Sequence, residues 1–170
     1  PLDNADIILS KYPFFLDFET GQISTGEFID RITEIAQNRV SSEEVLKAWN
    51  TMIRGFRTET INMLLDLKNK YRLFLLSNTN SIHEIHYNMQ LSDQHGIANL
   101  DRIFEKVYYS HLLKMRKPDK EIFLHVRDDA GLNPGESLYI DDTEVHVNTA
   151  RALGFRAWHL APPQKITDLL

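Results

Sequence analysis

The sequence predicts an α/β fold: a three-layer, Rossmann-like parallel sheet with helices on both faces, preceded by a small all-helical part. Two observations lead to this prediction. From residue 57 onward, short apolar runs typical of buried parallel strands alternate with segments of helical periodicity. Before that point, the recognisable patterns are all helical. We therefore divide the 170 residues into a helical cap, 1–54, and a Rossmann-like core, 55–170.

Two segments of the predicted cap carry signals for the start of a helix. Ser24-Thr25 precedes the first, with Glu27 close behind it. Ser41-Ser42 precedes the second, and Glu43-Glu44 falls in its first turn, where negative charge suits the helix dipole. The apolar residues that recur near helical spacing in the first segment are Ile23, Phe28, Ile29, Ile32 and Ile35.

The predicted core alternates four strands with four helices. The strands are expected at 71–76, 106–109, 137–140 and 155–160. The helices are expected at 57–70, 81–90, 120–130 and 143–153, the last ending before Gly154 in the position of a C-terminal glycine. Ligands of such sheets bind at the carboxyl ends of the strands, so the candidate site residues are those that follow each predicted strand.

The first strand runs into Ser77-Asn78-Thr79-Asn80 and then into a predicted helix. A hydroxyl, an amide and the free N–H groups of a helix N-terminus meet there, and together they can hold a phosphate. Ser, Thr and Asn are also ordinary N-cap residues, and this stretch by itself favours a simple helix start over a phosphate site.

The third strand ends in Asp141-Asp142. Adjacent carboxylates repel each other unless a cation or buried donors relieve them, and oxygen-rich sites of this kind suit Mg²⁺. A solvated acidic turn is the alternative. Lys117 follows the second strand, where its ammonium can pair with a phosphate or a carboxylate, although a Lys-Pro pair is usually only part of a loop.

Taken in order, these strand-end residues resemble the second, third and fourth motifs of the haloacid dehalogenase-like hydrolase superfamily. The residues that carry the resemblance are Leu75–Thr79, Leu112–Phe123 and Tyr139–Glu144 with Ala150–Phe155. In addition, Phe18–Ser24 with Glu27-Phe28 is similar to the start of the helical cap in the subgroup that includes sugar-phosphate phosphatases. The order of the motifs, more than any one of them, carries the resemblance.

The resemblance implies a role for each strand-end residue. Ser77 and the backbone of Asn78 would hold the oxygens of the transferring phosphoryl group, and Lys117 would neutralise charge and orient the nucleophile. Asp141 and Asp142 would bind Mg²⁺, with Asp142 in the more direct contact. The implied activity is that of a Mg²⁺-dependent hydrolase, a phosphatase that acts on a small phosphorylated metabolite through an aspartyl-phosphate.

The nucleophile of that family is the first aspartate of an Asp-x-Asp motif on a strand near the N-terminus. The chain contains no Asp-x-Asp, and the superficially similar Phe14–Thr20 lies in the predicted cap, so we interpret it as a helix end or turn. The family's first strand lies between the strands predicted here at 71–76 and 137–140. Without it, buried backbone groups would stay unpaired at a cost of about 1–3 kcal/mol each. We therefore expect that strand and the nucleophile to lie before Pro1, and residues 1–170 alone to be inactive.

Two alternative functions remain open at this point. One is a non-catalytic member of the same fold that binds a phosphorylated ligand or a protein. If residues 1–170 are the complete chain, we expect an inactive remnant that needs a further strand from elsewhere. The other is a metal-free dehalogenase, which the acidic pair disfavours because displacement of halide from carbon gives Mg²⁺ nothing to bridge.

Composition limits the partners of the protein. With 24 acidic and 19 basic residues, the net charge is −5, which argues against nucleic acid and anionic membranes as partners. The absence of cysteine excludes disulfides, thiolate metal sites and cysteine nucleophiles, and it fits a cytoplasmic location. No apolar run approaches the ~18 residues of a membrane span. We expect a small phosphorylated substrate, no nucleic acid and no membrane, and the sequence does not indicate an oligomeric state.

Two further sets of residues were considered for the site. His83 and His86 are three residues apart on a predicted helix, but no third metal ligand is placed near them, so we interpret both as surface or partly buried side chains. Trp49 and Phe56, near the junction of the predicted cap and core, are interpreted as packing residues.

Overall fold

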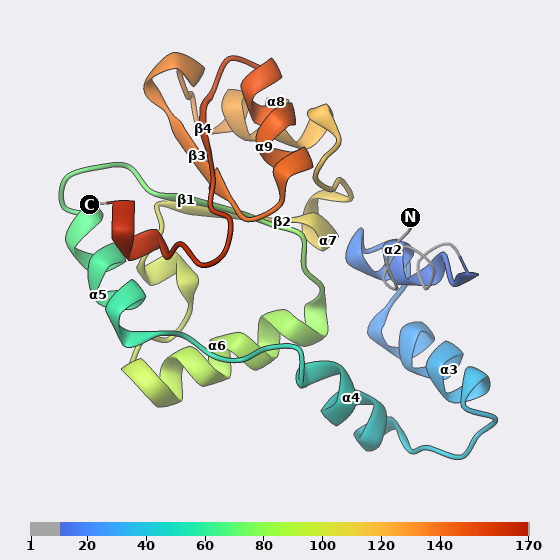
Figure 1. Ribbon diagram of the computed structural model, residues 1–170. Helices are drawn as coiled ribbons and strands as arrows, with labels where there is room; N and C mark the ends of the chain where they lie inside the picture. The colour runs from blue at the N-terminus through green and yellow to red at the C-terminus, as the bar shows by residue number, and fades with distance from the viewer. Residues whose placement is uncertain (1–10, 170) are drawn as a thin grey trace.

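The computed structural model describes residues 11–169, which form a group of helices followed by a core of parallel strands and helices (Figure 1). We call residues 11–54 the N-terminal helical segment. Its helices are α2 (Phe14–Glu19), α3 (Thr25–Ile35) and α4 (Ser42–Asn50). The strands of the core are β1 (Phe74–Ser77), β2 (Lys106–Tyr109), β3 (Leu138–Asp141) and β4 (Arg156–His159). The core helices are α5 (Thr58–Leu67), α6 (Ser81–His95), α7 (Ser110–Leu113), α8 (Lys120–Asp129) and α9 (Glu144–Ala152), with short 3₁₀ helices at Leu100–Arg102, Pro134–Glu136 and Ile166–Leu169.

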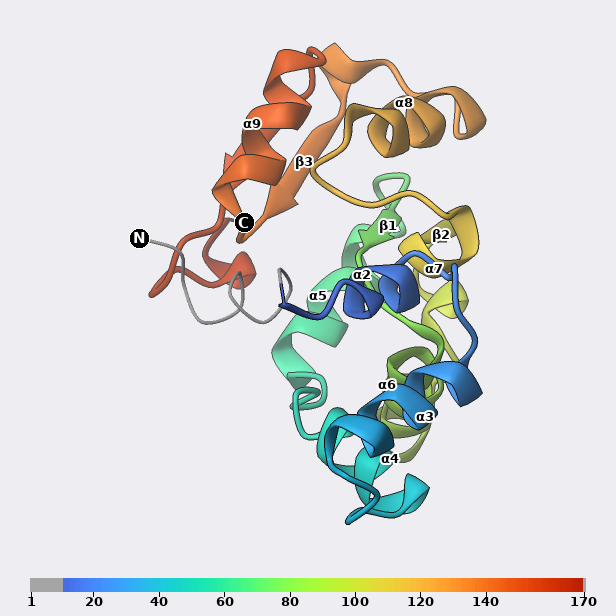
Figure 2. The same cartoon turned by 90° about the vertical axis from the view of Figure 1, so that its right-hand side faces the viewer.

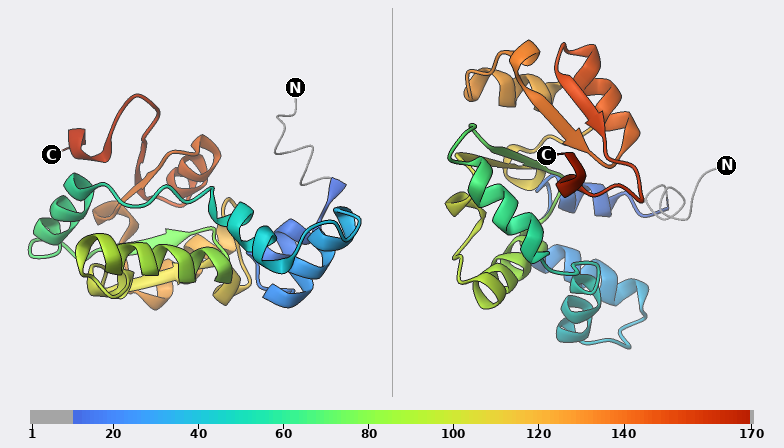
Figure 3. Two further views of the ribbon diagram at one scale, coloured as in Figure 1. Left: turned by 90° about the horizontal axis from the view of Figure 1, so that it is seen from below. Right: turned by 60° about the vertical axis from the view of Figure 1, so that its left-hand side comes forward.

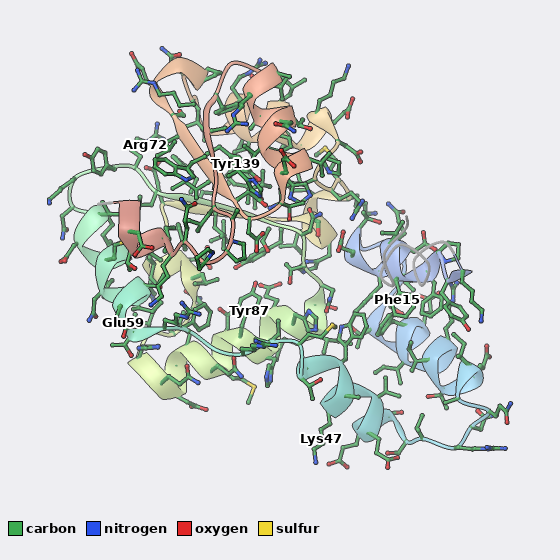
Figure 4. The ribbon with its side chains drawn as sticks, in the orientation of Figure 1. Phe15, Lys47, Glu59, Arg72, Tyr87 and Tyr139 are labelled. Atoms are coloured by element: carbon green, nitrogen blue, oxygen red, sulfur yellow. The ribbon has the colours of Figure 1, made fainter. Side chains whose placement is uncertain are left out.

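The two predicted helix starts in the N-terminal helical segment are confirmed. Ser24 is the N-cap of α3, and its hydroxyl accepts a hydrogen bond from the Glu27 N–H while the Glu27 carboxylate accepts one from the Ser24 N–H. Ser41 and Glu44 form the same reciprocal pair at α4. The aromatic core of this segment includes stacked Phe18 and Phe28 rings, and Phe15 lies within it (Figure 4).

All four predicted strands are present and parallel, but the described residues form two pairs rather than one continuous sheet. β1 pairs with β2, where Ser77 lies opposite Tyr109, and β3 pairs with β4, where Asp141 lies opposite His159. Within residues 11–169, β1 and β3 each have one unpaired edge. These are the edges between which the resemblance places its first strand.

Helices cover both faces of the β1–β2 pair, as predicted. Leu75 packs with residues of α5 and α6, while its neighbour Leu76 packs with residues of α8 and α9. Successive side chains of a strand point to opposite faces, so the two helical layers lie on opposite sides of β1. Figure 1 and Figure 3 show α5 and α6 on one side of β1–β2, and α8 and α9 with β3–β4 on the other.

The N-terminal helical segment meets the core at the start of α6. Ile82 of α6 is part of the same apolar cluster as Phe14 and Phe28, and α4 lies beside the N-terminal end of α6 (Figure 2). In the part of the chain that the structure describes, no helix combines the length and the apolar character needed to cross a membrane.

Candidate active site

The loop after β1 joins a helix start to the Ser77 hydroxyl, which has little hydrogen bonding within residues 11–169. Asn80 is the N-cap of α6, and its side-chain oxygen accepts from the His83 N–H at 3.0 Å. The N-cap interpretation of this stretch therefore holds for Asn80. Ser77 ends β1, and among the described residues its hydroxyl makes only one long contact, 3.5 Å, to the Asn78 carbonyl. The Ser77 hydroxyl is thus available to a ligand.

The Asn78 side chain ties this loop to Lys117. Its amide nitrogen donates to the Lys117 carbonyl at 2.9 Å, and its oxygen accepts from the Lys117 N–H, also at 2.9 Å. This two-way bond fixes the backbone of Lys117 beside the end of β1. The sequence pointed to the backbone of Asn78 and missed this role of its side chain, which only the three-dimensional contact reveals.

Lys117 reaches from this loop to the end of β3. Its ammonium lies 2.7 Å from Asp141 Oδ2, and the two side chains are only 9% and 7% exposed. Asp141 Oδ2 also accepts from the Tyr139 hydroxyl, and Oδ1 accepts from the Thr143 N–H at 2.8 Å and faces His146 Nδ1 at 3.1 Å. Tyr139, labelled in Figure 4, belongs to β3 itself.

These contacts decide the charge state of Asp141. Burial by itself would raise the pKa of the carboxyl, but the bonds from Lys117 and Tyr139 outweigh it and hold the pKa well below its ordinary value. Asp141 is therefore ionised at neutral pH, and protein donors occupy both of its oxygens. His146, in the first turn of α9, was not predicted as a site residue from the sequence; its position shortly after the acidic pair at the start of a helix was the available signal.

Asp142 differs from Asp141 in its surroundings. It is exposed, and within the described residues its side chain accepts only from the Thr143 hydroxyl, at 3.3 Å. Most of its lone pairs are therefore free for a cation. Residues 11–169 contain no group of three or more histidines, aspartates and glutamates that could hold a metal by themselves. The adjacent carboxylates nonetheless fit Mg²⁺, which takes one or two carboxylates and completes its shell with water and phosphate oxygens.

The structure thus brings the predicted residues of three segments to the carboxyl ends of the strands. Ser77 and Asn78 follow β1, Asp141 and Asp142 end β3, and Lys117 is bonded to both groups. The acidic residues near the start of the chain lie elsewhere. Asp17 and Glu19 are in helix α2, not on a strand, and Glu19 pairs with Arg116 at 2.7 Å. This agrees with our rejection of Phe14–Thr20 as a catalytic strand.

The fold and this arrangement define an α/β protein whose candidate site residues lie at the carboxyl ends of its parallel strands. The family model described as haloacid dehalogenase-like hydrolase matches residues 14–154. The chain belongs to this family of hydrolases, and the resemblance inferred from its motifs is confirmed.

Individual relatives agree with this assignment. The chain is 28% identical over 160 residues to a D-ribitol-5-phosphate phosphatase of Bacteroides thetaiotaomicron, covering 92% of this chain and 77% of the relative. The fold of the chain is similar to the crystal structure of a HAD family enzyme of the same organism, with a TM-score of 0.89 and 34% identity. The match covers 96% of this chain and 80% of that enzyme. That enzyme has also been solved in complex with magnesium and inorganic phosphate. A predicted HAD-like hydrolase of Porphyromonas gingivalis matches with a TM-score of 0.84, 32% identity and coverage of 97% and 82%.

Proposed function

We propose that this chain carries the phosphate- and metal-binding residues of a Mg²⁺-dependent phosphatase that acts on a small phosphorylated metabolite. The observation that carries the proposal is the connected set Asn78–Lys117–Asp141, in which one buried ammonium joins the ends of β1 and β3. The relatives named as a phosphatase and as a complex with magnesium and phosphate support it.

Each residue has a distinct task in this proposal. The Ser77 hydroxyl and the backbone N–H of Asn78 bind the phosphoryl oxygens, because they lie just before the N-terminus of α6, where anions are favoured. Lys117 places a positive charge beside them and is held by Asn78 and Asp141. Such fixed donors stabilise a charged transition state without having to reorganise during the reaction.

Asp142 and Asp141 form the proposed metal site. Asp142 is the direct ligand because its oxygens are the less occupied ones, while Asp141 contributes its negative charge and fixes Lys117. When bound, Mg²⁺ would neutralise charge on the phosphoryl oxygens. The residues of this chain bind the phosphoryl oxygens and the metal, fix the position of Lys117 and neutralise charge in the site.

The N-terminal helical segment is the proposed cap, with its boundary to the core near residue 54. It lies beside the start of α6, next to the proposed phosphate loop (Figure 2). A cap in this position closes over the site and excludes water from it. Its residues would then select the part of the substrate that lies beyond the phosphate.

The test is an assay of the full-length protein with p-nitrophenyl phosphate and with a panel of sugar and polyol phosphates. We expect hydrolysis that EDTA abolishes and added Mg²⁺ restores. Asp142→Asn is expected to weaken Mg²⁺ binding measured by calorimetry, whereas Asp129→Asn, at an exposed pair with Lys106, serves as the matched control.

Three outcomes would decide against parts of the proposal. Equal rates with and without EDTA would remove the metal role. Phosphate binding without turnover would identify the non-catalytic, phospho-ligand-binding alternative. Absence of both binding and turnover would overturn the proposed function.

A further inference from the structure

Three consecutive residues at the start of α6 contact all three described helices of the N-terminal helical segment, or the residues next to them. Asn80 contacts Trp49 of α4, and the Ser81 hydroxyl lies 2.8 Å from the Thr25 hydroxyl at the start of α3. Thr79 is joined to the end of α2 through one intermediate side chain, Ser110. These three residues directly follow Ser77-Asn78, the proposed phosphate loop.

Of these three connections to the N-terminal helical segment, the one at Asn80 involves the most contacts. Its side-chain oxygen accepts from Trp49 Nε1 at 3.4 Å, and its amide nitrogen lies 3.2 Å from His83 Nδ1. His83 Nε2 donates to the Trp49 carbonyl at 3.1 Å, and the two rings stack with 5.3 Å between their centroids. Asn80 and His83 are both buried, so each of these polar contacts replaces one with water.

Thr79 is connected to α2 by a buried hydroxyl. Ser110 Oγ accepts from the Thr79 N–H at 2.9 Å, and its proton faces two acceptors, the Glu19 carbonyl at 2.7 Å and the Thr79 carbonyl at 2.9 Å. One hydroxyl proton serves one of these acceptors fully at a time. A movement of the Thr79 backbone is therefore transmitted to the end of α2.

Helix capping alone does not explain the carboxamide at position 80. Serine caps a helix as well as asparagine does, and a serine oxygen would accept the same bond from His83 N–H. The amide nitrogen of Asn80 contacts His83 Nδ1, and the side-chain oxygen that caps the helix also accepts from Trp49 Nε1. Asn80 therefore combines the N-cap with contacts that reach the N-terminal helical segment.

We propose that Asn80 is a positioning residue that couples the proposed phosphate loop to the N-terminal helical segment, so that an anion bound at Ser77-Asn78 changes the contact between Asn80 and Trp49. The inference rests on the proposed function, because it takes the loop after β1 to be the phosphate site. Coupling of this kind needs an element that both sites contact, and residues 79–81 are that element.

The test uses the fluorescence of Trp49 in the full-length protein carrying Trp158→Phe, which leaves Trp49 as the remaining tryptophan of these 170 residues. Inorganic phosphate is titrated with Mg²⁺ present, and its binding is measured in parallel by calorimetry. We expect the Trp49 emission to change with the same midpoint as binding.

Asn80→Ser is the decisive variant, because it keeps an N-cap and loses the contacts to Trp49 and His83. We expect it to bind phosphate while its Trp49 emission no longer responds, and its kcat/KM toward sugar and polyol phosphates to fall about fivefold, as for one lost neutral hydrogen bond. Asn133→Ser is the matched control: Asn133 caps the 3₁₀ helix Pro134–Glu136, far along the chain from the loop, and the variant should respond like the parent.

The possible failures are distinguishable. The coupling is wrong if the parent protein binds phosphate without a change in Trp49 emission. It is also wrong if the Trp49 emission of Asn80→Ser changes on phosphate binding as it does in the parent. In both cases the proposed function stands. If calorimetry shows no phosphate binding by the parent, the proposed function fails and the inference fails with it.

Discussion

Lys117 and Asp141 form the buried ion pair on which the proposed site depends. A charge removed from water is costly unless its partner and further hydrogen bonds compensate for it, and Asp141 has these in Lys117, Tyr139, Thr143 and His146. The pair therefore places a positive charge at a fixed point between two strands. Its loss would affect both stability and charge in the site.

Lys117→Met is expected to destabilise the full-length protein by about 3 kcal/mol, because the variant leaves the buried Asp141 carboxylate without its cation. Urea unfolding at pH 7 measures this. Lys106→Met is the matched control, since Lys106 pairs with Asp129 at an exposed position and should cost less than about 1 kcal/mol. Equal losses in the two variants would show that burial of the Lys117 pair does not matter.

His83 gives the protein a predictable dependence on pH. Burial lowers its pKa, the bond to the Trp49 carbonyl opposes this, and the neighbouring His86 adds to the lowering. The folded protein therefore keeps His83 neutral at a pH where the unfolded chain takes up a proton. Stability is complete above the ordinary histidine pKa of about 6.5 and falls as the pH drops through it, by up to about 1.4 kcal/mol for each pH unit.

The comparison that isolates this effect is with His83→Gln, whose side chain does not titrate. Between pH 7.5 and pH 5, the parent protein should lose more stability in urea unfolding than the variant does. If both lose the same amount over that range, His83 is not the group responsible.

At this scale, the sequence predicted which side chains meet but not how they are held. Ser77, Lys117 and Asp141-Asp142 follow strands, and the rule that strand ends gather at one edge was enough to place them together. The two-way bond of Asn78 with Lys117 and the contact of His146 with Asp141 depend on loop geometry that has no periodic signal.

At the scale of elements, local side-chain chemistry explains where the helices of the N-terminal helical segment begin. Ser24 and Ser41 each satisfy free N–H groups of a helix and are in turn bonded by a glutamate three residues later. Such pairs act within one turn of chain, which is why they were readable from the sequence.

Ser24→Ala should destabilise the protein by about 1 kcal/mol through loss of the N-cap of α3. Ser92→Ala provides the same chemical change at an exposed position inside α6, where alanine favours the helix, and it should be neutral or slightly stabilising. Chemical denaturation of both variants checks the difference. A cost for Ser92→Ala equal to that for Ser24→Ala would contradict the capping argument.

The predicted strands agree with the structure within three residues at their ends. The strand predicted at 71–76 begins three residues later, at Phe74, because the paired register with β2 starts there, opposite Lys106. The short helix α7 was not predicted, since four residues are too few for a periodicity to show. The pairing of strands into β1–β2 and β3–β4 also lies outside what the apolar pattern specifies.

At the scale of the whole molecule, the N-terminal helical segment and the core are joined by polar contacts around the loop after β1 and by a close approach of backbone to backbone. Glu19 pairs with Arg116, the neighbour of Lys117, and Gly21 lies directly against His111 of α7. These contacts involve residues some 90 positions apart in the chain, which no local pattern in the sequence reveals.

A substitution at Gly21 tests how tightly the N-terminal helical segment is packed against the core. Its φ is +63°, and a Cβ at this position would lie 2.1 Å from the His111 carbonyl oxygen. Gly131 has nearly the same conformation, φ +61°, and apart from its chain neighbours no atom of the described residues lies within 4 Å of such a Cβ. Gly131→Ala should therefore cost only the left-handed backbone penalty, about 1–2 kcal/mol.

Gly21→Ala carries the same penalty and must in addition move α2 away from α7, so we expect it to cost about 1–3 kcal/mol more than Gly131→Ala. Urea unfolding of the two variants gives this difference directly. Because the displaced segment also contacts Thr79 through Ser110, hydrogen exchange at the start of α6 should rise in Gly21→Ala and stay unchanged in Gly131→Ala. The two variants could instead lose the same free energy of unfolding and show the same hydrogen exchange at the start of α6. The N-terminal helical segment would then be free to shift on the core, and the close packing around the phosphate loop would have no part in holding it.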